Sequence, residues 1–356
     1  MKRIVLFVDG LTQGGAQRQL VGLAGLLQQK GHLVQVVTYH DTPFFESDLR
    51  CLGIKHVCFQ RPNSKVRLIV RIRHLFKEQR PDVVLSYLDT PNTIASVLKL
   101  TGMKYKLIVS ERNTTQWLTL RDKMRFFLYR WVDVIVPNSF SQERFIINHF
   151  PHLSSKIQVI TNFVDLDLFR PVIKEKRSGL IKIIGAGRIE RQKNIDCLIK
   201  ATKCVIDKGY EIRVDWYGRQ TELIFNYKKI LEDFGLSAAF SFHEPTTAIQ
   251  EKYQEADLFC LPSFYEGYPN VLCEAMACGL PVICSNVCDN PIIMAEGVNG
   301  FLFNPHDPND LATQIVRFAT SSAEVRKLMG RKSRKLAERK FNKEEYINSY
   351  LKLIRE

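Results

Sequence analysis

The chain has 356 residues, 45% of them hydrophobic and 25% charged, a composition that excludes a disordered or fibrous protein and predicts two globular domains. No apolar run reaches the roughly 18–20 residues that a membrane-spanning helix needs, and the short apolar start is interpreted as a buried strand. The net charge of +14 is uneven, because residues 1–170 carry 24 Lys and Arg against 13 Asp and Glu, whereas residues 171–356 carry 27 against 24. We therefore expect a polyanionic partner to meet the first half of the chain.

The nine cysteines are an odd number, and none of them forms a C-x-x-C pair or has histidines at zinc-binding spacing. We expect them to be reduced and to pack as small hydrophobic side chains. The sequence thus predicts neither a disulfide framework nor a metal site.

In the first half, short apolar runs alternate with amphipathic stretches. Helices are expected over residues 13–30 and 66–79. Strands are expected over residues 4–8 and 34–38 and within "DVVLSYL", "KLIVSER" and "VDVIVPNS". Strands that are apolar throughout and separated by helices are typical of a parallel sheet that is covered on both faces.

The pattern restarts after Arg170-Pro171 and a charged run, which together are typical of a linker. Strands are expected within "IKIIGAGRIE", "IRVDWYG", "AAFSFHE", "DLFCLPS" and "PVICSNV", with helices over 194–208, 221–234 and 246–255 and after Asn270. The fold class is therefore α/β, with two doubly wound, Rossmann-like parallel-sheet domains in tandem, over 1–168 and 169–340. The last segment is helical, and residues 341–356 are expected to pack back on the first domain. Ligands of such sheets bind beyond the carboxyl ends of the strands, so the expected site is a cleft between the domains.

Two glycine-containing loops each follow the first strand of a predicted domain. Gly14 and Gly15 open the first helix, where backbone N–H groups can approach a phosphate or a sugar, or can simply form a tight turn. In "GAGRIERQKN" the third glycine of a dinucleotide fingerprint is replaced by Glu190, while Arg188 and Lys193 lie five residues apart. A guanidinium and an ammonium in this position favour a diphosphate over two solvated cations.

The stretch "YEGYPNVLCEAMACG" places Glu266 and Glu274 eight positions apart around a turn. Gly267 and Pro269 prevent the two glutamates from sharing one regular helix, and Asn270 is expected to be the N-cap of a helix that starts at Val271. The two carboxylates would then flank an anion-attracting helix terminus, which suits a polyhydroxylated ligand attached to a phosphate. The alternative is that Glu274 only offsets the helix dipole and that Glu266 is exposed to solvent.

Two basic stretches in the first half interleave cations with apolar side chains. The first, around residues 61–80, and the second, "WLTLRDKMRFFLYRW", are typical of helices that lie on an anionic membrane surface. The alternative is that their apolar faces pack on the sheet. The residues assigned to this surface are Lys65, Arg67, Arg71, Arg73, Trp117, Arg121, Lys123 and Arg125.

Together these segments resemble a retaining glycosyltransferase of family 4 with the GT-B fold. The matching segments are "GGAQRQ", "GRIERQKN", the Glu-x7-Glu block with "LPVI" after it, "NGFLFNP" and "TNFVDLDLF", so the resemblance covers nearly the whole chain. It implies a nucleotide-sugar donor bound mainly by the second domain, an acceptor bound by the first, and no metal.

The resemblance also implies roles for individual residues. Arg188 and Lys193 would hold the donor diphosphate, Glu266 would contact the transferred sugar at the reacting face, and Glu274 would accept a hydrogen bond from the ribose. Gly14 and Gly15 would close over the phosphates from the first domain. The residues between the two glutamates would add donor contacts from the backbone and the helix start: Gly267, Tyr268, Pro269, Asn270, Val271 and Leu272.

The chain departs from the family pattern at the end of the strand "KLIVSER". Many relatives have a histidine or an aspartate here, beside the transferred sugar, whereas this chain has Glu111, Arg112 and Asn113. Glu111 or Asn113 would offer a hydrogen bond to the sugar or the acceptor, and Arg112 would face a phosphate.

The sequence thus predicts a glycosyltransferase that transfers a hexose or an N-acetylhexosamine, with retention, to a lipid-linked or growing glycan for surface polysaccharide. It predicts a UDP-sugar donor, an anionic inner-membrane surface as partner, a cytoplasmic, peripheral location on the membrane, and no nucleic acid. The alternatives are a GDP-mannose-dependent mannosyltransferase, a nucleotide-sugar epimerase of similar fold, and a non-catalytic binding protein.

Overall fold

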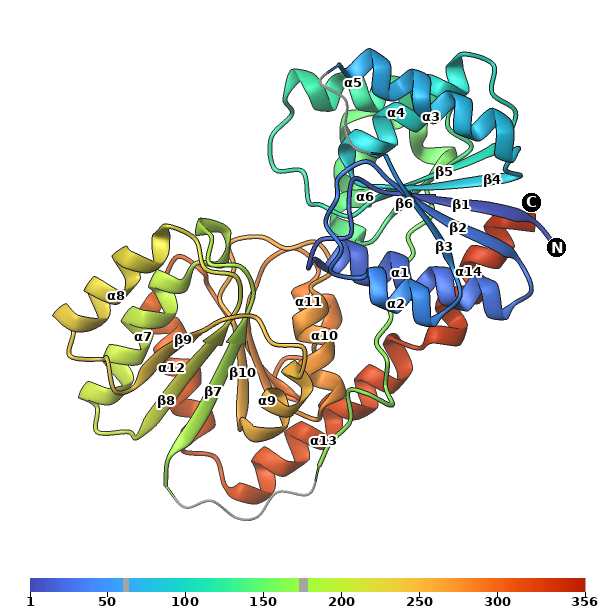
Figure 1. The fold of residues 1–356 in the computed structure, drawn as a ribbon. Helices are drawn as coiled ribbons and strands as arrows, with labels where there is room; N and C mark the ends of the chain where they lie inside the picture. Colours follow the sequence, from blue (N-terminus) through green and yellow to red (C-terminus); the bar gives the residue numbers. More distant parts are fainter. Residues whose placement is uncertain (60–63, 173–178, 356) are drawn as a thin grey trace. The chain divides into compact units, whose positions relative to one another are not determined.

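The computed structural model describes residues 1–59, 64–172 and 179–355. The chain divides into two compact units, which are described separately below. Unit 1 contains Met1–Asn162 and Glu344–Glu356, and unit 2 contains Phe163–Lys343. Each unit is built around a six-stranded sheet with helices on both faces (Figure 1).

The sheet of unit 1 is parallel, with the strand order β3-β2-β1-β4-β5-β6. Its strands are short and apolar, as the sequence predicts for a sheet covered on both faces. All five residues of β4, "VVLSY", are buried. The strands are β1 (Arg3–Phe7), β2 (Leu33–Thr38), β3 (Lys55–Cys58), β4 (Val83–Tyr87), β5 (Lys106–Glu111) and β6 (Val134–Pro137).

Helices α3, α4 and α5 pack on one face of this sheet, and α1, α2 and α14 lie on the other face (Figure 1). Helix α3 buries Leu68, Ile72 and Phe76, which share one side at the i, i+4, i+8 spacing of an amphipathic helix. The helices of unit 1 are α1 (Gly15–Gln29), α2 (Glu46–Cys51), α3 (Lys65–Gln79), α4 (Asp89–Leu100), α5 (Leu120–Leu128), α6 (Phe140–His149) and α14 (Lys343–Arg355), with 3-10 turns η1 (Tyr129–Trp131) and η2 (Pro151–Lys156).

The sheet of unit 2 is also parallel, with the order β12-β11-β10-β7-β8-β9. Counted within its own unit, this is the same 3-2-1-4-5-6 order as in unit 1, and it is the order of a Rossmann-like sheet. The prediction of two Rossmann-like domains is therefore confirmed. The strands are β7 (Ile181–Ala186), β8 (Ile212–Tyr217), β9 (Phe240–His243), β10 (Leu258–Leu261), β11 (Val282–Ser285) and β12 (Gly300–Phe303).

One hydrophobic cluster of unit 2 packs α7, α8 and α12 on the sheet, and a second cluster packs α9, α10 and α11 on the opposite face. Trp216 of β8 and Phe259 of β10 are among the largest fully buried side chains of the two clusters. The helices are α7 (Ile195–Asp207), α8 (Leu223–Asp233), α9 (Ile249–Glu255), α10 (Asn270–Ala277), α11 (Asn290–Ile293), α12 (Pro308–Ala319) and α13 (Ala323–Lys340), with the 3-10 turn η3 (Arg191–Lys193).

The C-terminal helix α14 belongs to unit 1 although it follows all of unit 2 in the sequence. Its Tyr350 hydroxyl lies 3.2 Å from the hydroxyl of Tyr87 on β4, and Glu344 pairs with Lys30 at 3.1 Å. The preceding chain belongs to unit 2, where Arg334 of α13 donates hydrogen bonds to the carbonyls of Leu166 and Phe169. The chain therefore passes between the units twice, near residues 162 and 343.

The structure contains several helices and strands that the sequence analysis does not predict. Strands β3 and β12, each four residues long, are not among the predicted strands. Helix α4 begins with Asp-Thr-Pro, which suggests a turn, but Pro91 lies in the first helical turn, where its missing N–H costs no helical hydrogen bond. Helix α12 was also missed, and the single C-terminal helical segment is in fact α13 and α14.

We expect Ile347→Ala to destabilise the protein by about 2–5 kcal/mol, because Ile347 is fully buried in unit 1 and the change leaves a cavity. Denaturant unfolding followed by circular dichroism measures the loss. Asn348→Ala, at an exposed position on the same helix, is the matched control and should change stability by less than about 0.5 kcal/mol. Equal stabilities of the two variants would contradict the packing of α14 described here.

Candidate active site

In unit 2, the strand order reverses between β7 and β10, which are neighbours in the sheet. The loops that follow their carboxyl ends therefore diverge and leave room for a ligand. The loop after β7 carries Arg188 and leads to Lys193 in η3, and the loop after β10 carries Ser263 and Glu266. Residues that are far apart in the sequence thus meet at one edge of one sheet.

Lys193 and Glu266 form an ion pair at the centre of this edge. The Lys193 ammonium nitrogen lies 2.6 Å from Oε1 of Glu266. Ser263 donates a hydrogen bond of 2.6 Å to the same carboxylate oxygen. The side chains of Lys193 and Glu266 are only 14% and 8% exposed, so both are largely buried and held in place.

The neighbouring loop residues fix the geometry of this pair. Asn194 adopts a left-handed conformation (φ 51°), and its side-chain amide donates to the carbonyls of Pro262 (3.1 Å) and Pro305 (2.8 Å). Gln192 donates to the carbonyl of Tyr265 at 2.8 Å, which joins the two loops. A Cβ on Gly187 would lie 2.8 Å from Cε of Lys193, so the glycine leaves room for the lysine side chain.

The segment between the two glutamates leads into α10. The helix begins at Asn270, and its N-cap is Pro269, with no capping hydrogen bond from a side chain. The expectation that Asn270 is the N-cap is therefore wrong, because proline suits the extended backbone that precedes the helix, at φ −71° and ψ 109°. The backbone N–H groups of Leu272 and Cys273 donate to the Pro269 carbonyl, so these amides are not free.

Glu274 lies in the second turn of α10 rather than in the first, and it is buried. The Tyr253 hydroxyl donates to its Oε2 at 3.5 Å. The side chains of Tyr268 and Leu272 are part of the hydrophobic core, so only their backbone can contact a ligand. Gly267, Pro269 and Val271 lie with them on the segment that joins Glu266 to Glu274.

Arg188 differs from Lys193 in its exposure. Its side chain is 62% exposed, and its guanidinium contacts the carboxylate of Glu190 at 3.3 Å. An exposed pair of this kind contributes little to stability. The Arg188 guanidinium can therefore leave Glu190 for an anionic ligand at small cost.

In unit 1, Gly14 and Gly15 begin α1 as the sequence predicts, with Gly14 as its N-cap. A Cβ on Gly14 would lie 2.3 Å from the amide oxygen of Gln17, so a larger residue would displace that side chain. The loop before the helix is held by Asp9, whose carboxylate accepts from the N–H of Gly10 at 2.8 Å. This loop follows β1, on one side of the strand-order reversal in this sheet.

Glu111, predicted to contact a sugar, is buried within a polar network. Its Oε1 accepts hydrogen bonds from the Tyr129 hydroxyl and, at 3.2 Å, from the Asn92 amide, and its Oε2 lies 3.4 Å from the Arg125 guanidinium. Burial raises the pKa of Glu111, while the positive charge of Arg125 acts to lower it. Glu111 is 1% exposed, and its contacts join side chains inside unit 1.

Arg125 was predicted to lie on a membrane-facing surface, and the structure shows that this is wrong. Its side chain is 4% exposed and forms ion pairs with Asp89, Glu111 and, at 3.2 Å, Asp122. The reason is its position on the inner side of α5, next to the buried Phe126. Alternating cations and aromatic residues in the sequence concealed this inward-facing arginine.

Arg112 and Asn113 follow β5 directly but have different surroundings. Arg112 is buried, with its guanidinium 4.8 Å from the centre of the Tyr87 ring. Asn113 is exposed. Of the three residues in "ERN", therefore, two point into unit 1 and one lies at its surface.

The remaining predicted membrane residues lie on α3 and α5 and just before α5. Arg67, Arg71, Trp117, Arg121 and Lys123 are exposed, and Arg73 is half-buried. The side chain of Lys65 lies outside the described residues.

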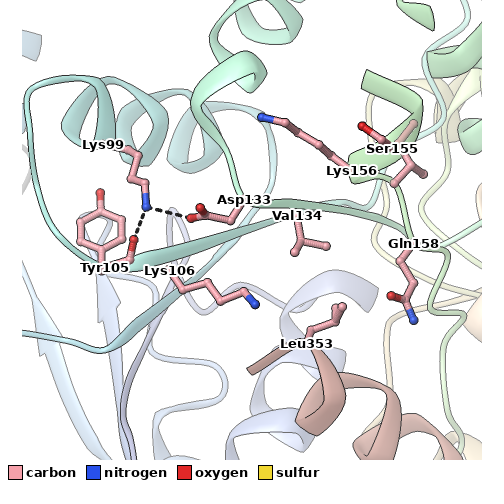
Figure 2. A pocket seen from close by; sticks show the side chains of 10 residues that line it. Lys99, Tyr105, Lys106, Asp133, Val134, Ser155, Lys156, Gln158 and Leu353 are labelled. Carbon is pink, nitrogen blue, oxygen red and sulfur yellow. Dashed lines mark hydrogen bonds and ion pairs between the residues drawn. The ribbon is translucent and has the colours of Figure 1, made fainter. Parts of the chain in front are cut away.

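A separate pocket of about 570 Å³ lies at the opposite edge of the sheet of unit 1, where β5 and β6 begin. Lys99 lies between the carbonyl of Tyr105 and the carboxylate of Asp133, with 2.8 Å to the latter (Figure 2). Lys156 donates to the carbonyl of Val132 at 2.8 Å. Because the pocket is at the amino ends of the strands, and Lys99 and Lys156 are engaged with the protein, we assign it no part in the chemistry.

Within the described residues, no group of three or more His, Cys, Asp or Glu side chains is arranged to hold a metal ion. None of the nine cysteines, all of which lie among the described residues, is joined in a disulfide, and five of them are buried.

The two sheets, the Lys193–Glu266 pair and the glycine loop define a GT-B glycosyltransferase. Residues 13–168 match the sequence family described as Glycosyltransferase Family 4. Residues 170–336 match Glycosyl transferases group 1. The chain belongs to these glycosyltransferases, and the predicted family and fold are confirmed.

Two curated relatives and one solved structure illustrate the similarity. D-inositol 3-phosphate glycosyltransferase of Paenarthrobacter aurescens is 29% identical over 51% of this chain, a stretch that spans about half (47%) of that relative. GalNAc-alpha-(1->4)-GalNAc-alpha-(1->3)-diNAcBac-PP-undecaprenol alpha-1,4-N-acetyl-D-galactosaminyltransferase of Campylobacter jejuni is 26% identical, covering 78% of this chain and 77% of the relative. HepE of Anabaena, solved in complex with UDP-glucose, has a TM-score of 0.88 at 16% identity, covering 100% of both chains, and this likeness concerns the fold alone.

Sequence reasoning missed Ser263 and Asn194 as parts of the site. Ser263 precedes Glu266 by three residues at the end of a strand, a position from which a hydroxyl can reach the carboxylate. Asn194 was interpreted only as a helix start, although a left-handed residue with an amide is suited to bridging loops.

We expect Arg125→Met to destabilise the protein by about 3–5 kcal/mol, because the change leaves Glu111 buried without its main opposite charge. Loss of Arg125 raises the pKa of Glu111 further, and the stability provided by protonated Glu111 is lost as the pH rises from the ordinary value of 4.5 through the folded-state pKa. Urea unfolding between pH 4.5 and 8 measures this dependence. Arg121→Met, at an exposed position on the same helix, is the control, and equal behaviour of the two variants would contradict the buried network.

Proposed function

We propose that this chain is a retaining glycosyltransferase that moves a hexose or an N-acetylhexosamine from a nucleotide sugar, with UDP favoured, to a hydroxyl of a lipid-linked or growing glycan. The observation that carries the proposal is the Lys193–Glu266 pair, held 2.6 Å apart at the strand-order reversal of unit 2. The Campylobacter relative, whose name specifies a diphospho-undecaprenol acceptor, supports a lipid-linked acceptor in surface polysaccharide synthesis. The Anabaena neighbour, solved with UDP-glucose, supports a UDP-sugar.

The proposed roles follow from charge. In the transfer, the bond between the sugar C1 and the phosphate oxygen breaks, the bond between C1 and the acceptor oxygen forms, and negative charge grows on the departing diphosphate. The cations of Arg188 and Lys193 would stabilise that charge without a bound metal, as the resemblance implies. Departure and attack on the same face of the sugar would give retention, with the acceptor proton passing to the departing diphosphate.

The carboxylates would bind hydroxyl groups. Glu266 would accept from the hydroxyls of the transferred sugar while it keeps its hydrogen bond from Ser263, and Glu274 would accept from the ribose. The Lys193 ammonium would keep the Glu266 carboxylate oriented between turnovers. Unit 1, through Gly14 and Gly15, would contribute backbone contacts and bind the acceptor.

We expect Glu266→Gln and Lys193→Ala to lower transfer by at least about 100-fold, because each removes a group that acts on the donor during bond cleavage. The assay measures release of UDP from UDP-sugars, with GDP-mannose as the competing donor. Lys200→Ala, which disrupts only an exposed pair on α7, should retain normal turnover. Near-normal turnover in either site variant would refute the assignment.

The same assay separates the alternative functions. An epimerised nucleotide sugar formed without acceptor would indicate an epimerase, and release of GDP from GDP-mannose would indicate a mannosyltransferase. Binding of nucleotide with no turnover of any donor would indicate a non-catalytic protein.

We further propose that unit 1 docks on an anionic membrane surface at the cytoplasmic face. No helix among the described residues is both long and apolar enough to cross a membrane. However, Leu120, Met124 and Phe127 of α5 are 76%, 58% and 50% exposed, at the spacing of one helix face. Trp117 precedes them at 84% exposure, and Arg121, Lys123 and Arg130 surround the stripe.

Helix α3 offers a second surface of the same kind. Val66 and Val70 are exposed at 69% and 58%, four residues apart, beside the exposed Arg67 and Arg71. Apolar side chains with flanking cations can enter the headgroup region while the cations contact anionic lipids.

We expect the double variant Trp117→Ser and Phe127→Ser to lose at least about tenfold in affinity for vesicles that contain anionic lipid, because it removes two apolar contacts with the headgroup region. Co-sedimentation with phosphatidylglycerol vesicles measures binding, and neutral vesicles test the role of charge. Phe225→Ser removes an aromatic side chain of unit 2 that is 74% exposed, and it should leave binding unchanged. Loss of binding in the control alone would overturn the assignment of the docking surface.

A further inference from the structure

Arg112 is a buried cation without a counter-ion. Arg112 follows β5 directly and is 8% exposed. Within the described residues, no carboxylate forms an ion pair with it, and its Nη1 and Nη2 make no hydrogen bond of ordinary geometry, although the Tyr346 hydroxyl lies near enough to interact with the guanidinium. Its principal electrostatic neighbours are three tyrosines, Tyr87, Tyr346 and Tyr350.

This environment contrasts with that of Arg125 in the same unit. Arg125 is also buried, but three carboxylates surround it. The stacking of Arg112 on Tyr87, at 4.8 Å, compensates only part of the lost hydration, because a ring face does not replace the hydrogen bonds of a guanidinium. A buried charge that lacks partners is costly, so the fold retains Arg112 at the expense of stability.

The position of Arg112 in the sheet indicates which kind of ligand could pair with its guanidinium. Parallel pairing joins Glu111 of β5 to Pro137 of β6, so Arg112 and Asn138 are the next residues along the two strands. Asn138 is also buried, and its side-chain Oδ1 has no hydrogen-bond donor within the described residues. An unpaired guanidinium and an unpaired amide oxygen that follow neighbouring strands, at the carboxyl edge of a Rossmann-like sheet, suit a phosphate that adjoins a hydroxyl.

We propose that the acceptor carries a phosphate or diphosphate group and that the Arg112 guanidinium binds it, with Asn138 accepting from an adjacent hydroxyl. This inference rests on the proposed function, because only a glycosyltransferase has an acceptor. The anion site itself does not depend on that function. The donor diphosphate is the other possible source of the same chemistry. The proposed donor contacts lie in unit 2, whereas Arg112 lies in unit 1, and the experiments below separate the two sources.

The first experiment measures thermal unfolding without ligand. Methionine matches the length of the buried arginine stem and needs no hydrogen bonds, so Arg112→Met should raise the melting temperature by about 2–4 °C. An arginine that serves only to support the fold would give the opposite result. A fall in melting temperature would therefore overturn the proposal.

The second experiment adds inorganic pyrophosphate to protein saturated with UDP. Pyrophosphate should raise the melting temperature of the wild-type protein further, should act weakly on Arg112→Lys, which keeps the charge without the fork, and should not act on Arg112→Met. An equal response of all three proteins would refute the anion site. If Arg112→Met does not fold, the weakened response of Arg112→Lys decides the question.

The UDP step of this experiment reports on the proposed function separately. UDP should stabilise both Arg112 variants and should stabilise Lys193→Ala less. If UDP stabilises none of these proteins, the proposed donor site is wrong, but the response to pyrophosphate alone still tests Arg112.

A third experiment distinguishes acceptor from donor. Two acceptors are compared at saturating donor: a prenyl-diphosphate-linked N-acetylhexosamine and the matching alkyl glycoside without phosphate. In Arg112→Lys, kcat/KM for the phosphorylated acceptor should fall roughly tenfold or more relative to that for the glycoside, with donor KM unchanged. A rise in donor KM with no discrimination between acceptors would assign the anion to the donor and overturn the proposal.

Discussion

The proposed chemistry depends on the 2.6 Å contact between Lys193 and Glu266. Each charge holds the other in position at this sheet edge, and the Ser263 hydroxyl donates to the same carboxylate oxygen. An arriving diphosphate would therefore meet an ammonium that is already placed, so little reorganisation is needed. Two neighbouring residues maintain this contact. Asn194, in its left-handed conformation, bridges the loops, and Gly187 has no Cβ that would clash with the Lys193 side chain.

The two units use buried polarity differently. In unit 2 the charges of Lys193 and Glu266 are paired across two loops, whereas in unit 1 Glu111 and Arg125 are sealed together and Arg112 has no counter-charge. A sealed pair gives rigidity, and an uncompensated charge gives affinity for an anion at a cost in stability. The exposed Arg188, with its weak surface partner, is a third case, because it can change partners without rearranging the core.

The sequence was sufficient for the fold because the strands are apolar throughout and the helices between them have clear faces. It assigned Lys193 and Glu266 to the same donor, but their direct contact depends on the strand-order reversal between β7 and β10, which only the structure shows. It was insufficient for Arg125, since a helix with cations on two sides gives no indication of which cation faces inward until α4 is placed beside α5. Similarly, the N-cap position of Pro269 and the second-turn position of Glu274 depend on where the loop after β10 ends, which tertiary contacts decide.

The double passage of the chain between the units has a consequence for biosynthesis. Unit 1 receives α14, with its buried Tyr346, Ile347 and Tyr350, only after all of unit 2 has been translated. The second unit can thus complete its core while the first still exposes the surface that α14 will cover. Unit 1 therefore cannot cover this surface until the residues that follow unit 2 have been synthesised, and its apolar groups are open to aggregation until then.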